Sequence, residues 1–94
     1  MEKKDWQKLI HLFEHVSSTK EMEELLLLFL TPSERDCLVQ RLRIVQALLT
    51  TDLPQRQVSS KVGVSITKIT AGSKELQRRS NSFKKSLIEF FQAR

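Results

Sequence analysis

The chain has 94 residues, a length that fits one domain over residues 1–94. Two glycines and two prolines are too few turn residues for a β-rich fold. Its 39% hydrophobic and 29% charged residues exclude a disordered tail, and its length excludes a two-domain enzyme. The net charge of +5 is unevenly distributed. Met1–Asp36 carries five basic and eight acidic residues, whereas Cys37–Arg94 carries eleven basic and three acidic ones. A basic C-terminal half favours an anionic partner such as nucleic acid.

The sequence shows no targeting or membrane segment. The longest apolar run, Leu25–Leu30, has six residues, whereas a membrane-spanning helix needs roughly 20. The first residues, MEKKDW, lack the apolar stretch of a signal peptide. A single cysteine, Cys37, cannot form an internal disulfide. We therefore expect a cytoplasmic protein with no membrane partner.

The first third of the chain predicts two helices, over residues 4–17 and 21–30. In the first, apolar residues recur at intervals of three and four, which makes one apolar stripe; they are Trp6, Leu9, Ile10, Phe13 and Val16. The second helix runs into LLLLFL, which is apolar on every side. Such a helix must be covered all round, so we infer a partner subunit.

The clearest helix start is Thr31-Pro32-Ser33-Glu34, where Thr31 and Glu34 have the spacing of a capping box and Pro32 suits the first turn. The helix that begins there is predicted over residues 32–50, with Leu38, Leu42, Val45 and Leu49 on one face. Pro54 breaks the chain after it. Three further helices are predicted over residues 54–61, 66–78 and 82–92. The expected fold class is thus all-α, with six helices and no strands.

Residues 55–72 have the pattern of a helix-turn-helix. Val58 and Val62 lie four apart and are expected to face inward, and Gly63 stands where the turn requires a positive φ. Val64 and Ile69 are expected to anchor the second helix on the first. Two short helices joined through a glycine also occur in proteins that do not bind DNA, but the basic half favours a DNA-reading role.

In a DNA complex, the second helix would lie in the major groove with its first residues against base edges. Hydroxyl, methyl and ammonium groups on this helix offer the contacts that base edges accept, whereas the first helix is placed against phosphates. The predicted DNA-binding residues are Gln55, Arg56, Ser59, Ile66, Thr67, Lys68, Thr70 and Ser73. Arg56 and Lys68 have an alternative interpretation as solvated surface charges.

The runs LTPSERDCLVQRLRIVQALL and LPQRQVSSKVGVSITKITAGS together resemble the tryptophan repressor family from about Leu25 to Leu76. The resemblance implies an intertwined homodimer with a helix-turn-helix reading head, which would cover LLLLFL. It also implies repression of tryptophan biosynthesis or transport genes, with L-tryptophan as a corepressor that activates operator binding. No other cofactor is implied.

Carried over by position, the family's ligand pocket implies six residues here, namely Leu28, Leu30, Thr31, Arg41, Gly72 and Glu75. Arg41 matches one of two arginines that flank the indole and meet the carboxylate, and Gly72 matches the glycine beside the ligand. The second arginine is replaced by Ala71, and a small pocket residue by Glu75. Lys68 could supply a replacement cation and Glu75 could pair with a ligand ammonium, or both could be surface charges.

Other chemistry finds little support in the sequence. His11 and His15 have zinc-binding spacing but no second ligand pair, so no metal site is predicted. Cys37 is expected to be a small packing residue rather than a nucleophile, and no catalytic residue or enzyme activity is predicted. Two alternatives to the corepressor-gated repressor remain: a DNA-binding regulator of the same fold with a different ligand or none, and a helical interaction subunit that does not bind DNA.

Overall fold

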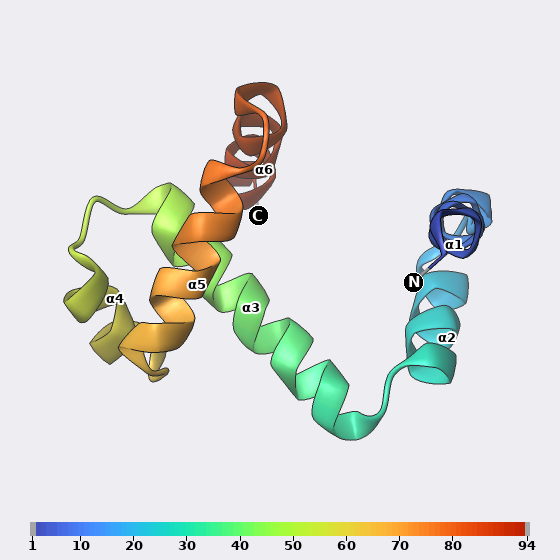
Figure 1. Ribbon diagram of the computed structural model, residues 1–94, viewed down its shortest axis with the longest axis horizontal. Helices are drawn as coiled ribbons and strands as arrows, with labels where there is room; N and C mark the ends of the chain where they lie inside the picture. Colours follow the sequence, from blue (N-terminus) through green and yellow to red (C-terminus); the bar gives the residue numbers. More distant parts are fainter. Residues whose placement is uncertain (1, 94) are drawn as a thin grey trace. The chain divides into compact units, whose positions relative to one another are not determined.

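The computed structural model describes residues 2–93, which form six helices and no strand (Figure 1). The helices are α1 (Lys3–His15), α2 (Thr19–Phe29), α3 (Pro32–Thr50), α4 (Gln55–Val62), α5 (Ile66–Gln77) and α6 (Asn81–Ala93). The prediction of an all-α chain with six helices is therefore confirmed. The chain divides within α3 into two compact units, an N-terminal unit, Met1–Asp36, and a C-terminal unit, Cys37–Arg94.

The N-terminal unit holds α1 and α2, and a serine cap marks the start of α2. Ser18 precedes α2, and its hydroxyl accepts a hydrogen bond from the Glu21 backbone N–H at 3.1 Å. This serine satisfies one of the backbone donors that every helix start leaves without an intrahelical partner. Neither α1 nor α2 buries any of its described side chains, so the unit has a large exposed apolar surface.

The start of α3 has the capping box that the sequence predicts. The Thr31 backbone N–H donates to Glu34 Oε1 at 2.9 Å, and the Glu34 backbone N–H donates to Thr31 Oγ1 at 3.2 Å. The backbone bond from Thr31, together with the Thr31 side chain, lowers the pKa of the Glu34 carboxyl, since these donors stabilise the ionised form. The reciprocal bonds fix the residue at which α3 begins.

The hydrophobic core lies in the C-terminal unit and is centred on the helix-turn-helix. Six residues from α3, α4, the turn and α5 are buried together: Ile44, Ala47, Val58, Val62, Val64 and Ile69. Val58 and Ile69 are completely buried. Val58, Val62, Val64 and Ile69, the four inward positions predicted for the helix-turn-helix, are thus confirmed. This packing stabilises α4 and α5, which are too short to be stable as isolated helices.

The turn between α4 and α5 depends on Gly63, which has the expected positive φ of 79°. Its backbone N–H donates to the Ser59 carbonyl at 2.9 Å, which closes α4. The Ser59 hydroxyl donates to the Val64 carbonyl beyond the turn. From α3, Arg43 Nη2 donates to the Val62 carbonyl at 2.9 Å. The end of α4 is therefore held both from within the turn and by α3.

After α5, Ser80 accepts a hydrogen bond from the Phe83 backbone N–H at 3.1 Å and so caps α6. Phe83 and Leu87 of α6 then lie along the groove described below. In the part of the chain that the structure describes, no helix combines the length and apolar character needed to cross a membrane.

Candidate nucleic-acid interface and ligand groove

The second helix of a helix-turn-helix is its recognition helix, called the reading helix here, and it must expose its first residues. The start of α5 has this exposure. Ser65 is its N-cap, with the hydroxyl accepting from the Lys68 backbone N–H at 3.3 Å. Ile66 is 42% exposed, and Thr67 is exposed next to it. Because Ile69, one turn after Ile66, is completely buried, α5 is anchored while Ile66 and Thr67 stay exposed to solvent.

Thr70 and Gln55 connect the two helices of the helix-turn-helix. The Thr70 Oγ1 lies 2.9 Å from Gln55 Oε1 on α4 and 2.9 Å from the Ile66 carbonyl. The single hydroxyl proton serves one of these acceptors at a time. Both side chains are half-buried, so the contact between Gln55 and Thr70 links α4 to α5 beside the core.

The other predicted DNA-binding residues differ in their surroundings. Arg56 is exposed on α4, and Ser73 is half-buried on α5. The Ser59 hydroxyl is engaged with the Val64 carbonyl, so it has no proton to donate to a phosphate while that bond persists. Lys68 donates from its Nζ to Gln40 Oε1 on α3 at 3.0 Å. The structure therefore brings the predicted set together on α4 and α5, but gives Ser59 and Lys68 partners within the protein.

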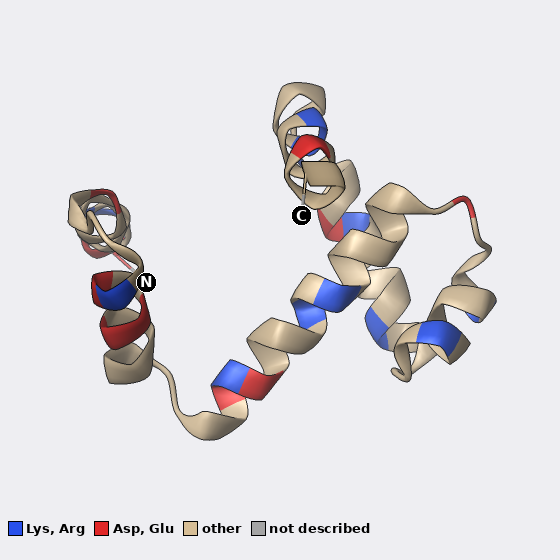
Figure 2. Cartoon of the chain, turned by 180° about the vertical axis from the view of Figure 1, so that it is seen from behind, with Lys and Arg blue, Asp and Glu red and all other residues tan. Residues whose placement is uncertain are grey.

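Basic residues run along the helices of the C-terminal unit (Figure 2). In residues 2–93 the ion pairs join Glu75 to two arginines, at 2.9 Å to Arg78 and 3.9 Å to Arg79. Arg56, Lys61 and Lys74 are exposed and have no carboxylate partner within the described chain. Unpaired exposed cations of this kind attract phosphates.

A groove of about 690 Å³ lies among α3, α5 and α6, a volume in the range of about 300–1,000 Å³ that small-molecule sites usually have. Its lining combines apolar side chains with a few charged ones. The lining residues are Cys37, Gln40, Arg41, Ile44, Val45, Lys68, Ala71, Gly72, Glu75, Leu76, Arg79, Phe83 and Leu87. The groove therefore shares α5 with the reading head.

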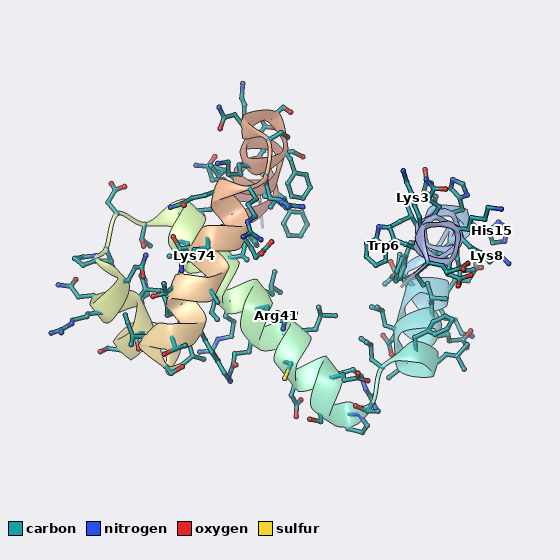
Figure 3. All side chains as sticks on the ribbon, in the orientation of Figure 1. Lys3, Trp6, Lys8, His15, Arg41 and Lys74 are labelled. Atoms are coloured by element: carbon teal, nitrogen blue, oxygen red, sulfur yellow. The ribbon has the colours of Figure 1, made fainter. Side chains whose placement is uncertain are left out.

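Three of the six predicted ligand-binding residues meet in this groove. Arg41 comes from α3, where Figure 3 labels it, and Gly72 and Glu75 come from α5. Ala71, the position at which the family's second arginine is missing, also lines the groove. The lining thus contains both a matching residue of the family pattern and its main departure.

The remaining three, Leu28, Leu30 and Thr31, belong to the N-terminal unit. Leu28 is 77% exposed at the end of α2. Leu30 is the C-cap of α2, with its backbone N–H donating to the Leu26 carbonyl at 2.9 Å. The Thr31 hydroxyl accepts from Glu34. Their place in a ligand site stays a prediction.

Cys37 does not have the surroundings that the sequence suggested. The prediction of a packing residue is wrong for this chain, because Cys37 is exposed and lines the groove. It lies one helical turn before Arg41, so it shares the groove-facing side of α3. Among residues 2–93, His, Cys, Asp and Glu form no group of three that could hold a metal ion.

Sequence reasoning missed Gln40 and the two α6 residues of the groove, Phe83 and Leu87. Helical spacing carries a signal for Gln40, since residues 37, 40, 41, 44 and 45 fall on one face of α3. No local signal identifies Phe83 and Leu87, which read as an ordinary apolar stripe. Only the packing of α6 beside α3 and α5 brings them into the groove.

Comparison with known proteins finds matches over most of the chain. The family model described as Trp repressor protein matches residues 4–90. A Trp operon repressor homolog from Vibrio vulnificus (strain YJ016) is 41% identical over 88 residues, which cover 94% of this chain and 86% of the relative.

Two further relatives extend the comparison. A Trp operon repressor homolog from Vibrio campbellii is 41% identical over 91 residues, with 94% of this chain and 91% of the relative covered. One from Xylella fastidiosa (strain 9a5c) is 46% identical over 72 residues, with 77% and 78% covered. The matched segment includes residues of all six helices, so the similarity is not confined to the helix-turn-helix.

Proposed function

This chain belongs to the Trp repressor family, and from that membership we propose that it represses tryptophan biosynthesis or transport genes by binding operator DNA in response to L-tryptophan. Membership makes the protein a transcriptional regulator and not an enzyme. A repressor of this kind acts where the DNA is, so a cytoplasmic location is part of the proposal.

One observation carries the proposal: α5 belongs both to the exposed reading head and to the groove. Its first turn presents Ile66 and Thr67 to solvent, while Ala71, Gly72 and Glu75 on the same helix line the groove. A ligand that occupies the groove therefore contacts the element that would enter the DNA. A ligand bound in the groove can favour one orientation of α5 over another. The ligand changes the affinity for DNA only as far as it binds the DNA-competent orientation more tightly than the other.

On the DNA side, we assign base contacts to Ile66, Thr67 and Thr70, whose methyl and hydroxyl groups suit thymine methyls and base edges. Phosphate contacts fall to Gln55 and Arg56 on α4. Ser59 supports the turn through its bond to Val64. Ser73, half-buried one turn further along α5, is assigned to the margin of the interface.

On the ligand side, Arg41 is assigned to the carboxylate of L-tryptophan, because a guanidinium binds carboxylates through charge-assisted hydrogen bonds. Gly72 is assigned to the site on the basis of the family resemblance, and its missing side chain makes room for Ile44 of α3, which also lines the groove. Glu75 is the acidic group available to a ligand ammonium. Leu28, Leu30 and Thr31 complete the assigned set on the basis of the family resemblance.

We also propose that the protein is an intertwined homodimer. The N-terminal unit leaves large apolar side chains exposed, among them Trp6 at 48%, Leu27 at 47% and Phe29 at 53%. Apolar surface of this extent on one chain marks an interaction face. A dimer would also supply two reading heads for two half-sites about one helical turn apart.

A second candidate function follows from Ala71. An arginine side chain is absent from the groove at this position, and a site that lacks it offers one stacking plane and one cation fewer to an indole ring. A regulator with the same DNA-binding head and a different amphipathic ligand is therefore the alternative.

Operator binding in the presence and absence of ligand tests the proposal. We expect a duplex with two half-sites to bind more tightly when millimolar L-tryptophan is added, and the affinity to fall steeply with salt. Calorimetry with L-tryptophan should show heat of binding. If no heat appears and DNA affinity is unchanged, L-tryptophan is not the corepressor; if no duplex binds specifically under any condition, the DNA-reading role is wrong.

A further inference from the structure

Lys68 stands where the reading helix meets the groove. It is the third residue of α5, a position from which a side chain can contact DNA. Its Nζ instead donates to Gln40 Oε1 on α3 at 3.0 Å, and both residues line the groove. The ammonium group is therefore held at the groove by a residue of another helix.

The charges of the groove are unbalanced at this end. Glu75 supplies the acidic group of the lining, and it pairs with Arg78 and Arg79. Within residues 2–93, neither Arg41 nor Lys68 has a carboxylate partner. Both side chains are exposed, and two cations without a counter-charge beside apolar side chains can bind an anionic group on an apolar ligand.

The present partner of Lys68 is one that a carboxylate can displace. Gln40 contributes a neutral carboxamide oxygen, so its bond to the ammonium has one charged partner, whereas a carboxylate adds the attraction of an opposite charge. Ala71 follows Lys68 by three residues, on the same face of α5. Alanine has no side-chain donor that could compete for a ligand carboxylate. Its methyl group is also too short to block the ammonium group of Lys68.

We propose that Lys68 acts with Arg41 to bind the carboxylate of the groove ligand, and so determines ligand specificity rather than base recognition. This inference rests on the proposed function, since it requires a ligand in the groove. It assigns the groove to ligands that carry a carboxylate next to an apolar body, in preference to the same molecules without the carboxylate.

Calorimetry of the full chain with L-tryptophan and with tryptamine, which lacks the carboxylate, tests the inference. The variants are Lys68→Met and the control Lys61→Met, which removes the same charge from an exposed residue of α4 outside the groove. We expect Lys68→Met to weaken L-tryptophan binding about tenfold, because a hydrogen bond to a charged group is lost. Tryptamine binding should change less than about twofold for either variant, and Lys68→Arg should restore most of the affinity for L-tryptophan.

The outcomes separate this inference from the proposed function. Equal affinity of Lys68→Met and the unchanged protein for L-tryptophan overturns the role of Lys68 alone. An equal loss for tryptamine also overturns it, because the effect then does not depend on the carboxylate. If the unchanged protein binds neither compound, the proposed ligand and this inference fail together. Should Lys68→Met fail to fold, Lys68→Gln provides the same comparison.

Discussion

Gly72 of α5 lies so close to Ile44 of α3 that a Cβ atom at position 72 would stand 2.9 Å from the Ile44 Cγ2. Ile44 is only 3% exposed and packs within the core, so its branched methyl has little room to move. The missing side chain therefore sets how closely α5 approaches α3. Both residues line the groove, which means that this contact also shapes the site proposed for the ligand.

Replacement of Gly72 by alanine should destabilise the protein despite the better helix propensity of alanine. Overpacking a core costs about 1–3 kcal/mol, whereas alanine gains roughly 0.5–1 kcal/mol over glycine inside a helix. We expect a net loss of about 1 kcal/mol, measured by urea unfolding. In an Ile44→Ala background the added methyl has space, so the cost should disappear there; a cost that is the same in both backgrounds would show that Ile44 is not the obstacle.

Gly63 is required for a different reason, which a pair of substitutions can isolate. Its φ is 79° and no atom lies within 4 Å of a Cβ built on it, so alanine there meets conformational strain but no clash. We expect Gly63→Ala to cost about 1–2 kcal/mol. Asparagine tolerates the left-handed region better, so Gly63→Asn should lose less in thermal unfolding. Equal losses for the two variants would contradict this explanation.

The capping box of α3 should make stability depend on pH. Because the folded pKa of Glu34 is lowered by its bonds with Thr31, the carboxylate stabilises the fold fully above its unfolded pKa, and this contribution is lost as the pH falls through the folded value. Glu34→Gln keeps an acceptor but cannot titrate. The difference in urea midpoint between the two proteins should therefore be constant near neutral pH and change on acidification below the unfolded pKa. A difference that does not vary with pH would exclude Glu34 as the titrating group.

Arg56 and Thr67 should affect DNA binding in distinct ways. Arg56→Gln is expected to weaken all duplexes alike and to reduce the slope of log affinity against log salt by about 1, because one phosphate contact is lost. Thr67→Ala should reduce discrimination among operator variants by about 1–3 kcal/mol at one base pair, with the salt slope unchanged. Lys8→Gln, at an exposed site on α1, provides the charge-matched control. If Lys8→Gln lowers the slope as much as Arg56→Gln, the assignment of Arg56 fails.

Residues whose role depends on near neighbours in the chain could be interpreted from the sequence. Thr31 and Glu34 form the predicted capping box, and Gly63 has the predicted left-handed conformation. Val58 and Ile69 are buried as their spacing indicates. Each of these features is determined by a turn or two of helix, so spacing carries the information.

In the central helix, α3, the residues that pack within the chain are not the ones that its periodicity indicates. Its predicted apolar stripe includes Leu38 and Leu42, yet these are 47% and 50% exposed, whereas Ile44 and Ala47 are the buried residues. Helix periodicity identifies an apolar face but does not say which face packs within the chain and which stays available to a partner. That choice depends on where α4 and α5 pack.

By itself, the sequence determined the all-α class, the helix-turn-helix, the basic C-terminal half and the family, because each rests on residue types at short, regular spacings. Only the tertiary structure decided that Cys37, Gln40 and Lys68 face a groove together with Phe83 and Leu87 of α6. The physical reason is that a groove forms between elements far apart in the chain. The packing of α5 on α3 at Gly72 and Ile44, rather than any local pattern, directs these side chains to one place.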